Sequence, residues 1–331
     1  MDPTLPKTQG WWARIAPATT LALLAPLCAE VLPGATRFSS IFVFPIETAV
    51  WGGGTVLIRE IVRRRGLGWP ALLLFALALA LAEEFLIQQT SAAPLVIMLK
   101  HQVYARAGGI NYLYLAWALI YEPVMVVLVP VALAELIFPA RRAAPWLSRA
   151  GALLLVLLFL IGALLAWFSW THIARVKVFH LALYTPPLGL VAVTALVIIA
   201  LIVAALRLPA ASRQTMTIWP LLLGLAGAVW SALLFGIVLL AFGIAPAIPP
   251  ALPLAVAALL ALLPLAVARR KTLRDAQAMA LIAGVLIGSM AVTFVGFIGA
   301  APADLVFKIV VNVAALAWLV RLLLRYRDGA R

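Results

Sequence analysis

The residues most able to do chemistry in this chain are carboxyl groups placed in apolar surroundings. Six of the eleven acidic residues lie inside or at the margins of strongly apolar segments: Glu30, Glu47, Glu83, Glu84, Glu122 and Glu135. An unpaired carboxylate inside a bilayer costs several kcal/mol, so such residues are rare and usually functional. A carboxyl group can activate water as a general base or hold a proton in transit. These glutamates are therefore the first candidates for a site.

Helical spacing groups some of these residues on common faces. Glu84 and Gln88 are four positions apart and share a helix face, whereas Glu83 points about 100° away from Glu84. Asn111 and Glu122 align on another helix. We therefore expect a polar seam between segments 69–90 and 111–138, in which two carboxyl groups lie close together, as suits either a general base or a proton-binding site.

The elements that carry these residues are membrane-spanning helices. The chain has 331 residues, of which 66% are hydrophobic and only 11% charged, a composition outside the range of soluble domains. A spanning helix needs about 20 mostly apolar residues. The sequence predicts an all-α, polytopic integral membrane helix bundle of about ten transmembrane helices, at 15–33, 41–61, 69–90, 111–138, 150–170, 181–206, 217–242, 251–268, 276–298 and 305–325.

The basic residues indicate how these helices are oriented. When the connections are assigned alternately to the two sides, nineteen of the 25 Lys and Arg residues fall on the side of the termini. Cytoplasmic loops carry such an excess, so both termini are expected to be cytoplasmic in a multi-pass protein of the cell membrane, the bacterial inner membrane. The net charge of +14 thus reflects topology, and no nucleic-acid partner is expected.

This orientation brings five glutamates to one side of the membrane. Glu83 and Glu84 lie about 20 Å above the cytoplasmic surface, from the 1.5 Å rise per residue, and Glu122 lies at a comparable level. Glu30, Glu47, Gln88, Asn111 and His172 complete the expected polar site in the outer half. The sixth acid, Glu135, is instead expected to form an interfacial ion pair with Arg141 and Arg142.

The sequence predicts a single membrane domain, 1–331, with an acid-bearing half at 15–145 and a scaffold half at 146–331. Segment 91–110 is amphipathic and is expected to lie on the outer surface or to fold back into the membrane. One cysteine and no Cys/His cluster predict no metal site and no cofactor. Gly52–Gly54, and Gly284 with Gly288, have the small residues typical of helix packing.

The stretch Ala82–Gln88, AEEFLIQ, resembles the first motif of the CPBP intramembrane proteases, the CAAX-prenyl-endopeptidase-like family, which reads EExxxR. The resemblance implies a membrane-embedded hydrolase in which Glu84 is the general base and Glu83 its partner. It further implies that Glu122 and His180 orient water or substrate.

The sequence departs from that family at three points. Gln88 stands in place of Arg, Glu122 stands in place of the second-motif His, and the HxxxN-like element at 180–184 lacks its Asn. A glutamate cannot supply the neutral donor and acceptor pair of an imidazole. The first 145 residues, about half of the chain, also resemble an uncharacterised group of bacterial polytopic membrane proteins, which implies no activity.

Three functions therefore stay open. The first is a CPBP-like hydrolase with glutamate-activated water. The second is a proton-coupled transporter or carrier that titrates Glu47, Glu84 and Glu122. The third is a non-catalytic membrane subunit or lipid-binding scaffold whose glutamates pair helices. The expected partners are membrane lipids, and a membrane protein or a lipid-like substrate is a further candidate.

Overall fold

The computed structural model describes residues 11–94, 105–208, 214–215, 218–241 and 247–328. Nine helices in these ranges are long and apolar enough to cross a membrane, and another apolar helix, Ile15–Val31, is shorter. The protein is an all-α, multi-pass membrane helix bundle, as the composition predicts. Each of the ten predicted segments corresponds to one helical unit, which we call a rod and which can consist of several consecutive helical elements.

The first five rods are composite, because π-helical or 3-10 stretches interrupt the α-helix. The first rod consists of α1 (Trp11–Pro26) and η1 (Leu27–Val31), and the second of η2 (Phe38–Val43), α2 (Phe44–Glu47), η3 (Thr48–Gly52) and α3 (Gly53–Arg64). The third consists of α4 (Trp69–Ala82) and η4 (Glu83–Ile87), and the fourth of α5 (Tyr112–Glu122), η5 (Pro123–Leu128) and α6 (Val129–Ile137). After η6 (Pro139–Arg141), the fifth consists of α7 (Arg149–Phe168) and η7 (Ser169–Val178).

The other five rods are more regular. They are α8 (Leu188–Arg207), α9 (Pro220–Ala241), α10 (Ala251–Arg270), α11 (Asp275–Val292) with η8 (Thr293–Phe297), and α12 (Pro302–Asp328). Two short pairs of β-strands lie in the connections between helices. β1 (Arg106–Ala107) is antiparallel to β2 (Ile110–Asn111), and β3 (Gln214–Thr215) is parallel to β4 (Lys271–Thr272).

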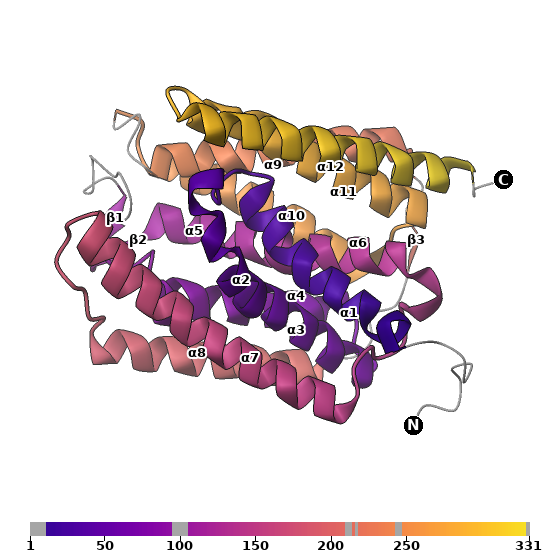
Figure 1. Cartoon of the computed structure of the whole chain (residues 1–331), viewed down its shortest axis with the longest axis horizontal. Helices are drawn as coiled ribbons and strands as arrows, with labels where there is room; N and C mark the ends of the chain where they lie inside the picture. The colour runs from indigo at the N-terminus through magenta and orange to yellow at the C-terminus, as the bar shows by residue number, and fades with distance from the viewer. Residues whose placement is uncertain (1–10, 95–104, 209–213, 216–217, 242–246, 329–331) are drawn as a thin grey trace.

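The acid-bearing rods form the middle of the bundle. In Figure 1, α7 and α8 lie along one long edge, α9 and α12 lie along the other, and α1 to α6 lie between them. Burial follows this order, because most of Tyr112–Ile137 is buried while Arg149–Val178 and Leu188–Arg207 are mostly exposed. The exposed faces of the outer helices are Leu, Ile and Val, as lipid requires. α1 begins and α12 ends at the same end of the bundle.

A buried ionic network fastens that end of the bundle. The Arg59 side chain is fully buried and donates to Glu135 (3.2 Å), to Glu60 (3.3 Å) and to the carbonyls of Ala144 and Arg142 (both 2.8 Å). Its guanidinium lies 3.4 Å from the ring centroid of Trp146. Three segments thus meet at one cation: α3, α6 and the connection that follows α6.

The ion pair predicted for Glu135 exists, but its partners are different. Glu135 accepts two hydrogen bonds from Arg63 (2.8 and 2.7 Å) as well as that from Arg59. Arg142 pairs with Asp275 instead (2.8 and 2.7 Å), because the chain turns through η6 after Ile137 and carries Arg142 toward α11.

Glycine allows the closest helix contacts. A Cβ added to Gly52 would lie 2.1 Å from the carbonyl oxygen of Ala22, and one added to Gly284 would lie 1.9 Å from that of Gly224. One added to Gly288 would lie 2.4 Å from the carbonyl oxygen of Ala228. Both glycine motifs are therefore packing devices: Gly52 brings η3 against α1, and the GxxxG spacing brings α11 against α9.

Candidate functional site

All four helices that carry the candidate glutamates are distorted where these residues lie. Glu30 is in η1, and Glu83 and Glu84 open η4; Glu47 directly precedes η3, and Glu122 directly precedes η5. All four distorted stretches are π-helical, a rare form that occurs often at functional sites. Proline is a local cause in two of them, because Pro26 precedes η1 and Pro123 begins η5, and proline cannot donate to the α-helical ladder.

The structure brings these five carboxyl groups together into what we call the glutamate cluster: Glu30, Glu47, Glu83, Glu84 and Glu122. Glu30 interacts electrostatically with Glu47 and Glu83, and Glu122 interacts with Glu84, Glu83 and Glu30. Glu47, Glu83 and Glu84 are buried, whereas Glu30 and Glu122 keep partial exposure. The predicted convergence of four helices on one site is thus present in the fold.

Hydrogen bonds within the cluster are few and unequal. The Glu122 and Glu84 carboxyl groups lie within hydrogen-bonding reach of each other, and Ser91 donates its hydroxyl to Glu84. Thr36 donates to one oxygen of Glu47. A carboxylate is only an acceptor, so a bond between two carboxyl groups requires a proton on one of them.

Unsatisfied polar atoms concentrate at the same place. Among the described residues, eight buried side-chain nitrogen or oxygen atoms have no hydrogen-bond partner, and seven belong to the cluster or its surroundings. They include both carboxyl oxygens of Glu83, which the Trp51 side chain approaches without good hydrogen-bond geometry. Buried groups of this kind are rare and are usually met by water, an ion or a functional role.

No cation offsets the cluster within the described part of the chain. The five ion pairs among the described residues lie at the other end of the bundle or at its surface, and none involves these glutamates. Arg37 donates to the carbonyl of Gly296 (3.0 Å) and lies over the ring of Phe297. Five like charges in a weakly solvated space repel strongly, so they cannot all be ionised together.

An aromatic wall on α5 borders the cluster. The Tyr121 hydroxyl donates to the carbonyl of Ala29, one residue before Glu30. Trp117 stacks on Tyr121 with 4.5 Å between the ring centroids. Tyr114, on the same helix, interacts electrostatically with Glu84 and Glu122. The rings limit access of water from that side.

The segment 88–94 covers the outer side of the cluster. Gln89 has a φ of +62°, uncommon for a residue with a side chain, and this turn directs Ser91 back toward Glu84. Asn111 donates its backbone N–H to the Ser91 carbonyl (2.9 Å). Within the predicted segment 91–110, residues 91–93 are therefore buried inside the bundle and 107–109 are exposed, whereas 95–104 lie outside the described residues.

Two arginines hold this cover. Arg106 donates to the carbonyl of Ala92 and to that of Gly109 (2.6 Å). Arg175, in η7, donates to the carbonyl of Pro94 (2.7 Å). Both are thus bound to backbone over the site and do not pair with the glutamates. Burial lowers the pKa of Arg106 from its ordinary value.

Among the other predicted site residues, Gln88, His172 and His180 have no described contact with the carboxyl groups. Asn111 caps α5, because its side chain accepts from the Tyr114 N–H (3.0 Å). Gln88 is half-buried at the end of η4. The His172 ring contacts Thr171 and stacks on Phe168. His180 is exposed, with a φ of +52°, and no hydrogen bond or ion pair links it to Glu84 or Glu122.

A second buried polar group on α12 was not predicted. Lys308 is almost fully buried and donates to the Leu32 carbonyl (2.5 Å) and to Thr293 (2.9 Å). Asp304 accepts from the backbone and hydroxyl of Ser39, and Asn312 is also buried. Positions 304, 308 and 312 are spaced at i, i+4 and i+8, a signal on one helix face that the sequence contains.

Comparison with family models, curated proteins and solved structures gave no match to this chain. The described residues also contain no group of three or more His, Cys, Asp or Glu side chains that could hold a metal ion. The site is therefore interpreted from its own chemistry, which is that of carboxyl groups close to one another beneath the polar segment 88–94.

Proposed function

We propose that this protein is a proton-coupled membrane transporter or carrier in which the glutamate cluster binds the coupling protons. The observation that carries the proposal is the close approach of the Glu84 and Glu122 carboxyl groups, in a cluster without an ion-pair partner among the described residues. Such a pair holds one proton and can exchange it when the local charge or solvation changes.

The surroundings support a site that changes state. The unsatisfied atoms of Glu47 and Glu83 leave room for further protons or for a polar substrate group. The cover at 88–94 reaches the pair through the Ser91 hydroxyl, so loss of the Glu84 charge weakens a contact that holds the cover down. Protonation of Glu84 and access to the glutamate cluster from the outer side are linked in this way.

A membrane-embedded hydrolase is the second candidate, and the same carboxyl pair favours it. Two carboxyl groups that share one proton can activate a water molecule between them. In this alternative Glu84 is the base and Glu122 the acid, with Glu83 as a neighbour. Neither described histidine, His172 nor His180, contacts the pair, so this route relies on carboxyl groups alone.

We further infer a location in the bacterial inner membrane with both termini cytoplasmic. The basic residues support this orientation: Arg59, Arg63 and Arg64 lie at the same end of the bundle as Arg141 and Arg142. Membrane lipids are then the immediate partners, and the glutamate cluster faces the outer leaflet.

Proton movement into proteoliposomes tests the transporter. Vesicles that contain the purified protein and a pH-sensitive dye are exposed to a panel of organic anions, organic cations and neutral metabolites. We expect at least one compound to move protons with the wild type and with Gln88→Ala, a control one turn beyond Glu84. Glu84→Gln and Glu122→Gln should abolish the movement while the proteins stay folded.

Two outcomes would count against transport. One is a proton flux that the glutamine variants match. The other is the lack of any flux in the wild type over the whole panel, combined with cleavage of membrane peptides that Glu84→Gln abolishes. The second result would favour the hydrolase.

A further inference from the structure

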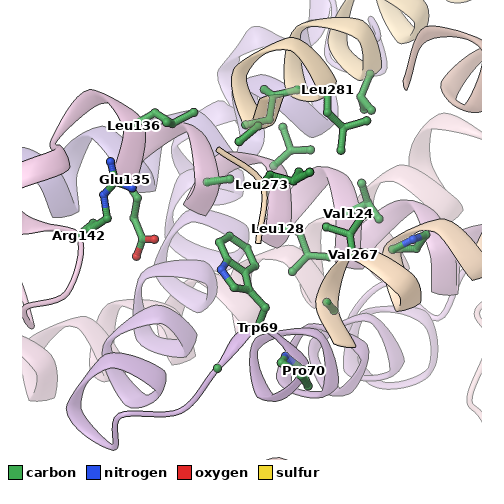
Figure 2. Close-up of a pocket in the computed structure, with 18 of the residues that line it drawn as sticks. Trp69, Pro70, Val124, Leu128, Glu135, Leu136, Arg142, Val267, Leu273 and Leu281 are labelled. Atoms are coloured by element: carbon green, nitrogen blue, oxygen red, sulfur yellow. The ribbon is translucent and has the colours of Figure 1, made fainter. Parts of the chain in front are cut away.

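A separate cavity lies at the opposite end of the bundle from the cover segment. Its volume is about 500 Å³, and residues of α4, α6, α10 and α11 line it. Pockets for small ligands typically have volumes of about 300–1,000 Å³. Figure 2 shows Glu135 and Arg142 at one side of this pocket and apolar residues such as Leu128, Val267 and Leu281 around the rest.

The polar end of the cavity consists of two ion pairs. Arg63 binds Glu135, and Arg142 binds Asp275 through two hydrogen bonds of 2.8 and 2.7 Å. The Arg142 and Asp275 side chains are 40% and 39% exposed, so either can turn toward a ligand at little cost. Bidentate guanidinium groups of this kind match the geometry of a phosphate.

The depth of the cavity matches one leaflet of a bilayer. From Glu135 at the polar end to Val124 at the inner end is eleven residues, about 16 Å of helical rise. From Asp275 to Val285 on α11 is ten residues, about 15 Å. The hydrocarbon core of a bilayer is about 30 Å thick, so the apolar part extends over about half of it.

We propose that this cavity binds a glycerophospholipid of the cytoplasmic leaflet. The phosphate lies at Arg142 and Arg63, and an acyl chain extends along Leu128 and Val267 toward Val124. Trp69, which also lines the cavity, is placed near the headgroup level, where Trp is common. The proposal does not depend on proton coupling, because none of the cluster glutamates lines this cavity.

The four charged groups at the polar end, two positive and two negative, sum to zero, which agrees with a zwitterionic headgroup that carries both a phosphate and an ammonium group. A zwitterionic headgroup can place its phosphate on Arg142 and its ammonium on Asp275. The other basic residues at this end, such as Arg64 and Arg141, do not line the cavity, so the site does not select an anionic headgroup over a zwitterionic one. A diacylglycerol has the same tails but no phosphate, so it lacks the feature that the ion pairs recognise.

Native mass spectrometry of the detergent-purified protein, loaded with dioleoyl-phosphatidylethanolamine or dioleoyl-phosphatidylglycerol, tests the site. We expect one tightly held phospholipid on the wild type. Ala278→Trp fills the cavity from α11 and should remove it. Ala291→Trp, on the exposed face of the same helix, should retain it. Equal retention by both variants would overturn the proposal.

A second variant separates the polar end from the apolar part. Arg142→Gln should weaken phospholipid binding about tenfold or more, the effect of one lost charged hydrogen bond, and should leave diacylglycerol binding unchanged. Arg65→Gln, at an exposed position of the same end, is the control. Stability is checked with Arg142→Gln/Asp275→Asn, which leaves no unpaired charge. If diacylglycerol binds as tightly as either phospholipid, or if Arg142→Gln binds both phospholipids normally, the phosphate assignment is wrong.

Discussion

At the residue scale, the partner of a buried glutamate decides what it can do. Glu135 receives three hydrogen bonds from Arg59 and Arg63, so its negative charge is offset in place. Glu84 receives the Ser91 hydroxyl and the Glu122 carboxyl instead. The first arrangement stabilises a fixed charge, and the second is the basis of the proposal that Glu84 and Glu122 share a proton.

The structural role of the ionic network can be tested at Arg59. Arg59→Leu leaves Glu60 and Glu135 buried with fewer donors, and breaking a buried pair in this way costs about 3–5 kcal/mol. We expect a clearly lower apparent unfolding temperature in detergent. Arg65→Leu, at an exposed position nearby, should change stability by less than about 0.5 kcal/mol. Equal losses in the two variants would show that the network contributes nothing specific.

At the element scale, the site depends on helices that are locally distorted and tightly packed. The π-helical stretches η1, η3, η4 and η5 meet at the glutamate cluster, while Gly52 brings η3 against α1. On the other side of the molecule, Gly284 and Gly288 hold the regular helices α9 and α11 together. Each rod that carries a cluster glutamate is thus distorted at that residue, although η7 shows that π-helical geometry also occurs elsewhere.

The α9–α11 contact predicts opposite results for two glycine substitutions. Gly284→Ala would place a Cβ 1.9 Å from the Gly224 carbonyl oxygen, and such overpacking typically costs about 1–3 kcal/mol. Gly236→Ala on α9 meets nothing within 4 Å, and it should be neutral or stabilising by up to about 1 kcal/mol through helix propensity. Apparent unfolding temperatures in detergent measure both, and a loss as large for Gly236→Ala would contradict the packing account.

At the scale of the whole molecule, the bundle has two chemically different ends. At one end, segment 88–94 covers carboxyl groups that have no ion-pair partner among the described residues. The other end contains the Arg59 network and the phospholipid cavity. The basic residues at the second end are the basis of the proposal that this end is cytoplasmic. The single cysteine, Cys28, is buried, which makes introduced cysteines easy to distinguish.

Cysteine accessibility tests this orientation. On a Cys28→Ser background, Ala107→Cys lies in the β1–β2 hairpin and Ala140→Cys lies in η6, and both positions are exposed. A membrane-impermeant maleimide added to intact cells should label Ala107→Cys and label Ala140→Cys only after lysis. The reverse pattern would invert the topology and place the glutamate cluster in the inner leaflet.

The sequence predicts this architecture well because its signals are strong and local. The lengths of the apolar segments predict all ten rods. The rise per residue of a helix predicts that Glu84 and Glu122 lie at the same height along the bundle, and the structure has their carboxyl groups close together. Contacts between distant segments could not be read in this way. The Arg142–Asp275 pair and the phospholipid cavity both depend on how α6 meets α11. The spacing of Asp304, Lys308 and Asn312 was visible in the sequence, but its partners, Leu32 and Ser39, were not.

The shared proton of Glu84 and Glu122 is the central claim, and infrared spectroscopy of the membrane-reconstituted protein tests it most directly. Protonated carboxyl groups give a carbonyl stretching band that ionised carboxylates lack. We predict this band in the wild type at neutral pH, a clear loss of its intensity in Glu84→Gln and in Glu122→Gln, and no loss in Gln88→Ala. A wild-type spectrum without the band, or one that both glutamine variants leave unchanged, would contradict the account.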